Sequence, residues 1–151
     1  MDRMETRERT WMEWVTLAFG VVYLAVGALG FAVTDGVGFA ARQGDTLMGF
    51  EVNPLHNIVH LAIGAALVGG FLGGRRSTGL VATLIGAVYL LVGVVGPFIT
   101  DTKANILALN GPDHFLHIGS AVVLLITGII ALRESQAGAT EMNRTEMRRA
   151  A

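Results

Sequence analysis

The chain has 151 residues, of which 52% are hydrophobic and only 15% are charged. That balance is too apolar for an ordinary soluble domain of this length. The formal net charge is −1, and the charge distribution offers no basic patch that would indicate a nucleic-acid partner. The chain has no cysteine, which excludes disulfides, thiolate metal ligands and thiol nucleophiles.

The charged residues gather at the termini and in three connections, and they leave four apolar stretches of about the length that crosses a bilayer. Lipid offers no hydrogen-bonding partner to the backbone, so single apolar stretches of this length must be helices. The sequence therefore predicts an all-α fold, an integral membrane four-helix bundle. We expect the spans near residues 12–34, 54–73, 78–100 and 113–132.

The segments outside the spans are short. Residues 1–11 form a charged N-terminal arm, and Trp11 at its end and Trp14 lie where an interfacial aromatic anchor would lie. The glycine-rich loop that ends at Asn53 carries apolar side chains that could cover the bundle. The membrane domain covers residues 12–132, and the polar tail 133–151 is expected to be flexible or to lie on the membrane surface.

The first and third stretches repeat one another at a constant offset. The first contains Gly20, Tyr23, Leu24, Val26, Gly27, Gly30, Thr34 and Asp35, and the third contains Gly86, Tyr89, Leu90, Val92, Gly93, Gly96, Thr100 and Asp101. The second and fourth also match, with Asn53, His56, Asn57 and His60 against Asn110, Asp113, His114 and His117. The chain is thus a duplicated helical hairpin. Each copy has two spans, so the copies enter the membrane in the same direction and equivalent residues lie at equal depth.

The arginines and lysines are distributed unequally between the two sides of this four-span arrangement. One side carries Arg42 and Lys103, and the other carries Arg3, Arg7, Arg9, Arg75, Arg76, Arg133, Arg144, Arg148 and Arg149. The positive-inside rule then places both termini in the cytoplasm and the protein in the cytoplasmic membrane.

Small residues and a tyrosine recur at helical spacing on the first and third spans, where they make one stripe each. Small faces let helices approach closely in lipid, so we interpret the stripes as packing surfaces. The two tyrosine hydroxyls need partners inside the bundle. The stripe residues are Gly20, Tyr23, Gly27, Gly30, Gly86, Tyr89, Gly93 and Gly96.

Ionisable residues lie on one face at the start of the second and fourth spans: His56, His60, Asp113 and His117. Such residues usually face the bundle interior and pair with each other. Three interpretations stay open. The side chains could form an interhelical hydrogen-bonded cluster with the neighbouring asparagines, they could ligate a divalent zinc or copper ion, or His60 and His117 could be the axial ligands of a haem b.

Familiar catalytic motifs are not present. The segment from His56 to His60 has the histidine spacing of zinc peptidases, but Asn57 stands where the general-base glutamate would be required. No nucleophile elbow or phosphate-binding glycine loop occurs. The sequence supports no enzyme activity.

The chain resembles the prokaryotic membrane family known as domain of unknown function 4383. The resemblance rests on the Gly-x-x-Tyr-Leu-x-x-Gly pattern of the first span, on the segment NPLHNIVHL from Asn53, and on DHFLH from Asp113, and it covers residues 14–132. It implies a small four-span membrane protein and carries over no activity, substrate or cofactor.

Two functions follow as hypotheses. The first is a non-catalytic membrane module or accessory subunit, in contact with lipid and with a second copy or another membrane protein, whose His/Asp/Asn cluster is structural and lies on the outer side. The alternative is a metal- or haem-binding redox protein that uses the histidines of the second and fourth spans.

Overall fold

The computed structural model describes residues 8–150 and is an all-α bundle of four helices. The helices are α1 (Trp11–Gly30), α2 (Pro54–Leu72), α3 (Arg75–Ile99) and α4 (Gly111–Ala150), and each is long and apolar enough to span a membrane. The predicted fold class is therefore confirmed. The helix bounds agree with the expected spans to within four residues, except that α4 is much longer.

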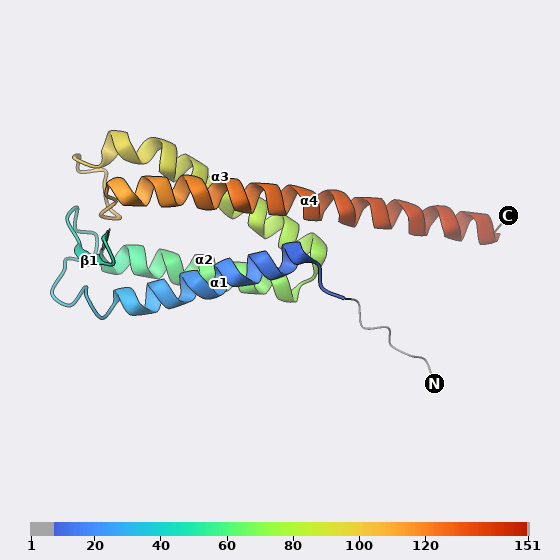
Figure 1. The fold of residues 1–151 in the computed structure, drawn as a ribbon, viewed down its shortest axis with the longest axis horizontal. Coiled ribbons are helices and arrows are strands. Elements are labelled where there is room, and N and C mark those ends of the chain that lie inside the picture. Colours follow the sequence, from blue (N-terminus) through green and yellow to red (C-terminus); the bar gives the residue numbers. More distant parts are fainter. Residues whose placement is uncertain (1–7, 151) are drawn as a thin grey trace.

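The helices pair as two hairpins, α1 with α2 and α3 with α4 (Figure 1). α1 and α3 run in one direction and α2 and α4 in the other, so the hairpins are parallel copies. The segments 31–53 and 100–110 gather at one end of the bundle, which we call the loop end. The start of α1 and the end of α4 lie at the opposite end, the termini end.

Local sequence signals explain how α1 begins and how its start is tied to the end of α2. The Thr10 amide and hydroxyl donate to the Glu13 carboxylate at 2.9 and 3.0 Å, which closes the first turn of α1. Arg9 donates to Glu13 at 2.9 Å and to the carbonyl of Phe71, and its guanidinium lies 4.4 Å from the centre of the Phe71 ring. This contact clamps the start of α1 to the end of α2.

Glycines let the two helices of each hairpin approach until their backbones touch. A Cβ on Gly64 would lie 2.7 Å from the Leu24 amide nitrogen and 2.8 Å from the Gly20 carbonyl oxygen. In the second hairpin a Cβ on Gly128 would lie 2.6 Å from the Thr83 amide nitrogen. The structure also places the six glycines of the predicted stripes against the partner helix of their own hairpin: Gly20, Gly27, Gly30, Gly86, Gly93 and Gly96. Close helix packing in lipid depends on such faces.

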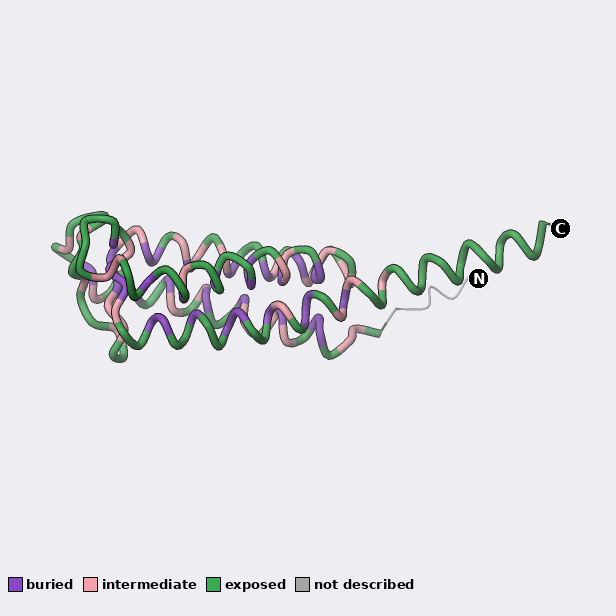
Figure 2. The backbone as a smooth tube through the Cα atoms, turned by 90° about the horizontal axis from the view of Figure 1, so that it is seen from above, coloured by how far each residue is buried: buried purple, intermediate pink, exposed green. Residues whose placement is uncertain are grey.

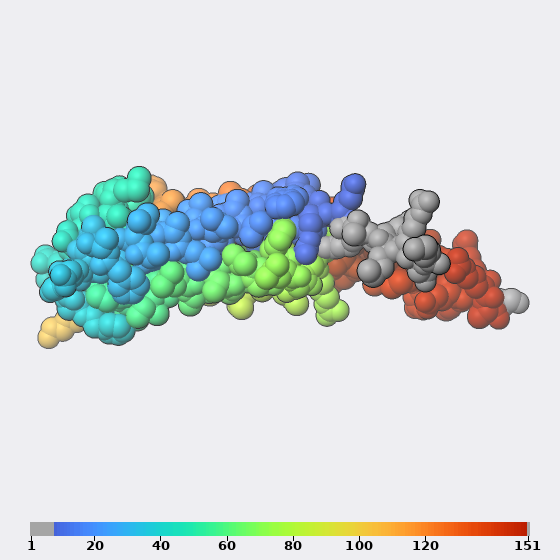
Figure 3. Space-filling view, turned by 90° about the horizontal axis from the view of Figure 1, so that it is seen from below, coloured from blue at the N-terminus to red at the C-terminus, as the bar shows by residue number. Residues whose placement is uncertain are grey.

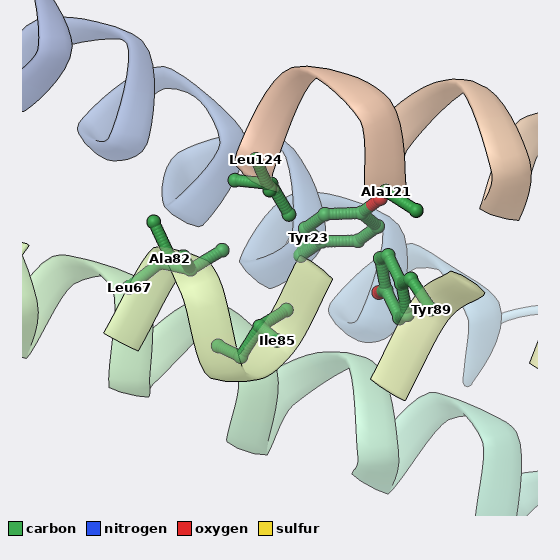
Figure 4. Close-up of a cluster of buried hydrophobic side chains, with 7 residues drawn as sticks. All are labelled: Tyr23, Leu67, Ala82, Ile85, Tyr89, Ala121 and Leu124. Atoms are coloured by element: carbon green, nitrogen blue, oxygen red, sulfur yellow. The ribbon is translucent and has the colours of Figure 1, made fainter. Parts of the chain in front are cut away.

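The core lies where the two hairpins meet (Figure 4). Tyr23 and Tyr89 lie side by side at its centre, with ring centroids 5.2 Å apart and the rings edge to face. Leu67 and Leu124, which are equivalent in the two repeats, are fully buried beside them. The repeat thus extends to the packing of the interior. Figure 3 shows α1 and α2 lying along one another on one face of the molecule.

The first loop is more ordered than the sequence indicates. It contains a small antiparallel hairpin of β1 (Asp45–Leu47) and β2 (Phe50–Val52). Met48 and Gly49 join the strands with φ angles of 54° and 93°, the left-handed conformation that two-residue hairpin turns adopt. A three-residue strand carries too short an alternating pattern to be found in the sequence.

The tail, which the sequence predicts to be flexible or to lie on the membrane surface, is helical, because α4 runs without interruption to Ala150. The extension beyond the bundle is exposed and leaves the termini end as a single helix (Figures 1 and 2). Its sequence has no apolar face, but alanine, glutamate, glutamine, methionine and arginine are strong helix formers. The i,i+3 pair of Glu141 and Arg144, 3.9 Å apart, adds a little local support.

We predict that Gly64→Ala lowers the free energy of unfolding by about 1–3 kcal/mol, since the added methyl group meets backbone atoms that cannot yield. Gly69→Ala on the same helix is the matched control, because a Cβ there meets nothing within 4 Å. Thermal unfolding in mild detergent, followed by circular dichroism, measures both. Equal stability of the two variants would contradict the close-packing interpretation.

Candidate metal centre

The histidines are held in place by capping residues at the loop end. The Asn53 side chain accepts a hydrogen bond from the His56 amide at 2.8 Å, which fixes the first turn of α2. The equivalent Asn110 accepts from the Asp113 amide at 3.3 Å and starts α4 in the same way. His60 and His117 then follow one turn deeper on their helices, at matched depth.

His56, His60 and His117 converge in the interior. One nitrogen of each ring lies within 4.8 Å of those of the other two. The side chains are 1%, 5% and 4% exposed, so water has almost no access to them. The His56 ring centroid is 4.4 Å from that of His60 and 6.2 Å from that of His117. We call these three residues the histidine triad.

The two central tyrosines support the triad from the termini side. The Tyr23 ring packs against His60 at 5.4 Å, and the Tyr89 ring packs edge-on against His117 at 4.9 Å. These contacts are equivalent in the two repeats. The Tyr23 hydroxyl also hydrogen-bonds to the Ser120 hydroxyl at 2.9 Å, across the junction between the hairpins.

Loop residues cover the triad at the loop end. The Asn53 amide group donates to the carbonyls of Ala41 and Ile106, both at 2.8 Å, and so ties the two loops together. Carbonyl groups of Glu51 and Leu107 interact with the His56 ring. The triad is therefore enclosed by backbone from both loops.

Asp113, predicted as a fourth ligand, is placed elsewhere. Its carboxylate accepts a hydrogen bond from the Asn110 amide at 2.9 Å, as in a capping box. Among the described residues, the group of converging donor atoms comprises the three histidines without Asp113. The aspartate occupies the position equivalent to His56, but it serves the helix start.

Asn57 and His114, which are equivalent in the two repeats, each make a hydrogen bond within their own hairpin. The Asn57 amide group donates to the Thr34 hydroxyl at 3.1 Å, and the equivalent His114 ring shares a hydrogen bond of 2.9 Å with the Thr100 hydroxyl. Gly30 and Gly96 make room for these side chains. Asn57 and His114 thus fasten α2 to α1 and α4 to α3, apart from the triad.

A haem does not fit between His60 and His117. In a bis-histidine haem the ligand nitrogens lie about 4 Å apart with the porphyrin plane between them. Here one His56 nitrogen lies within 4.8 Å of a nitrogen of each of the other two rings, so the His56 side chain occupies space next to both. The rings of Tyr23 and Tyr89 also contact the same two histidines. His56, Tyr23 and Tyr89 therefore leave no space for a macrocycle between His60 and His117.

Comparison with known proteins places the chain in a family. A family model described as "Domain of unknown function (DUF4383)" matches residues 13–130, which cover all of α2 and α3, nearly all of α1 and the first half of α4. The chain belongs to the DUF4383 family. Searches of curated proteins and of solved structures gave no match.

Sequence reasoning on this DUF4383 protein did not identify Ser120 as a site residue. Its equivalent in the first repeat is Ile63, so the repeat itself carried the signal. A serine that replaces an isoleucine at a matched position in a membrane span indicates that one repeat needs a hydroxyl there. That hydroxyl is the partner of Tyr23.

We predict that Asp113→Ala destabilises the protein by about 1 kcal/mol, because it removes the acceptor of the Asn110 amide. Asp113→Asn keeps an oxygen at that position and should remain closer to the wild type, with only the loss of a favourable charge at the helix start. Thermal unfolding in detergent measures both variants. The capping role would be wrong if the asparagine variant fell as far as the alanine variant.

Proposed function

We propose that this DUF4383 protein is a non-catalytic membrane protein that binds one copper or zinc ion between His56, His60 and His117. The observation that carries the proposal is the convergence of three buried imidazole nitrogens, from both repeats, within 4.8 Å. Imidazole is the commonest metal ligand among protein side chains.

Hydrogen bonding alone accounts poorly for the triad. In a structural cluster each buried donor is expected to face an acceptor. Here Nδ1 of His60 has no hydrogen-bond partner among the described residues, and the His56 and His117 rings face backbone carbonyls of Glu51, Leu107 and Asp113 but no side-chain acceptor. A cation at the centre would give one nitrogen of each ring a partner.

The ligand set favours copper and zinc over other ions. Calcium and magnesium prefer oxygen ligands, whereas imidazole suits zinc and copper. Tetrahedral geometry with bonds of about 2.0–2.1 Å needs nitrogens about 3.4 Å apart. The nitrogen–nitrogen distances would therefore shorten by up to about 1.4 Å on binding, relative to the limiting 4.8 Å separation. Three protein ligands leave the fourth position free.

We also propose an orientation in the membrane, from the distribution of arginine and lysine. The termini end carries Arg75, Arg76 and the arginines of the α4 extension, and the loop end carries Arg42 and Lys103. By the positive-inside rule the termini end is cytoplasmic. The triad then lies near the outer surface of the cytoplasmic membrane, under the two loops.

We predict that the purified, tag-free protein, stripped with chelator and then dialysed against Cu²⁺ or Zn²⁺, retains about one ion per chain by elemental mass spectrometry. His60→Ala and His117→Ala should each lower the affinity by tenfold or more, because two imidazoles hold the ion less well than three. His114→Ala is the matched control, since its ring bonds Thr100 outside the triad.

Two results would overturn this function. One is the absence of a retained ion from the wild type with either metal. The other is equal retention by the His60, His117 and His114 variants, which would place bound metal outside the triad. Circular dichroism on each sample establishes that the helices are intact.

The absence of native cysteines permits a clean test of orientation. Met48 in the β-turn and Met142 on the α4 extension are 88% and 63% exposed, at opposite ends. We predict that Met48→Cys reacts with a membrane-impermeant maleimide in intact cells. Met142→Cys should react only after the membrane is permeabilised. The reverse pattern would invert the proposed orientation.

A further inference from the structure

A groove runs between α1 and α4 and opens on the lateral, lipid-facing surface of the bundle. It has a volume of about 580 Å³, within the range of small-molecule sites. Apolar residues form its walls, among them Phe19, Val22 and Val26 of α1 and Phe115 and Val123 of α4. Its rim is strongly exposed, with Phe115 at 79% and Val22 at 55%.

The floor of the groove is polar. Tyr23, His60 and Ser120 line it, and they are only 5%, 5% and 6% exposed. The two hydroxyls hydrogen-bond to each other, and Nδ1 of His60 has no partner of regular geometry. A buried polar floor beneath apolar walls calls for a ligand with a polar atom at its leading end.

The duplication supplies an internal comparison for this groove. The pseudo-symmetry of the repeats makes the α1/α4 junction equivalent to the α2/α3 junction. At the latter, Ile63 and Ile85 pack into the core at the positions that correspond to Ser120 and Phe19. α2 and α3 also contact each other more extensively than α1 and α4 do. The α2/α3 junction is filled by aliphatic side chains, whereas the α1/α4 junction has a groove with the Ser120 hydroxyl at its floor.

We propose that this groove binds a membrane quinone, an apolar ring compound whose carbonyl oxygen reaches the floor. The carbonyl would accept a hydrogen bond from the Ser120 hydroxyl, whose oxygen accepts the Tyr23 proton, or from the His60 ring. The ring and its alkyl chain match the apolar walls and the lateral opening to lipid. Phospholipids fit less well, because their oxygen atoms lie at the membrane interface while this floor lies two helical turns inside α2.

This inference does not depend on a bound metal ion, although His60 is common to both sites. A quinone on the floor would contact the same ring that the triad uses. The two sites can therefore be tested separately by variants that fill the groove and leave all three histidines in place.

The experiment is a titration of the purified full chain in mild detergent with decylubiquinone, with bound ligand counted by native mass spectrometry. Gly119→Leu should fill the groove without disturbing the bundle, because a Cβ there meets nothing within 4 Å. We expect it to weaken quinone binding by tenfold or more. Gly69→Leu, on a lipid-facing position with equal space, is the matched control and should bind as the wild type does.

A second variant and a second ligand make the outcome decisive. Ser120→Ile copies the closed junction and should also abolish quinone binding, while Gly119→Leu, which touches neither Tyr23 nor the histidines, should keep the metal content of the wild type. Decylbenzene, which lacks carbonyls, should bind at least tenfold more weakly than decylubiquinone. The proposal is overturned if Gly119→Leu and Ser120→Ile bind quinone normally. It is equally overturned if decylbenzene binds as well, because the groove would then be a site for lipid chains.

Discussion

Close backbone contact within each hairpin is the constraint on which the rest of this structure depends. In lipid the burial of apolar side chains gives little drive to helix association, so the helices must gain contact by approaching closely. Gly20 and Gly64 do this in the first hairpin, and Gly79 and Gly128 do it in the second. The contact fixes how far each helix is rotated about its axis. The remaining polar faces of α2 and α4 must then point at the other hairpin, where they meet.

The duplication explains why the histidines meet at one depth. His60 and His117 occupy equivalent positions on parallel hairpins, so a two-fold arrangement brings them together, each backed by its own tyrosine. The third member of the triad breaks the symmetry. His56 enters the cluster, whereas the equivalent Asp113 caps its helix. Two identical repeats would offer an even number of histidines. The number is odd because the repeats differ at the position that His56 and Asp113 occupy.

Most of the fold and part of the site are predictable from the sequence for identifiable reasons. Length and apolarity determine the four helices, since the bilayer leaves few alternatives. The repeat predicts that His60 and His117 face each other. The repeat does not predict the direction of the Asp113 side chain in the first turn of α4. That direction decides whether Asp113 caps the helix or faces the histidines. The β-hairpin at Met48 and the helical tail depend on short-range contacts. Such contacts leave only a weak hydrophobic periodicity in the sequence, so the sequence does not predict either element.

The interior polar groups connect the proposed sites with stability. A buried polar atom without a partner costs about 1–3 kcal/mol, and a whole domain is stable by only about 5–15 kcal/mol. Nδ1 of His60 is such an atom among the described residues, whereas the His56 and His117 rings interact with backbone carbonyls of Glu51, Leu107 and Asp113. Aliphatic side chains would remove that cost, as Ile63 does at the position equivalent to Ser120. The proposed metal ion and the proposed quinone would offset this cost, because they would give partners to the histidine nitrogens and to the Ser120 hydroxyl.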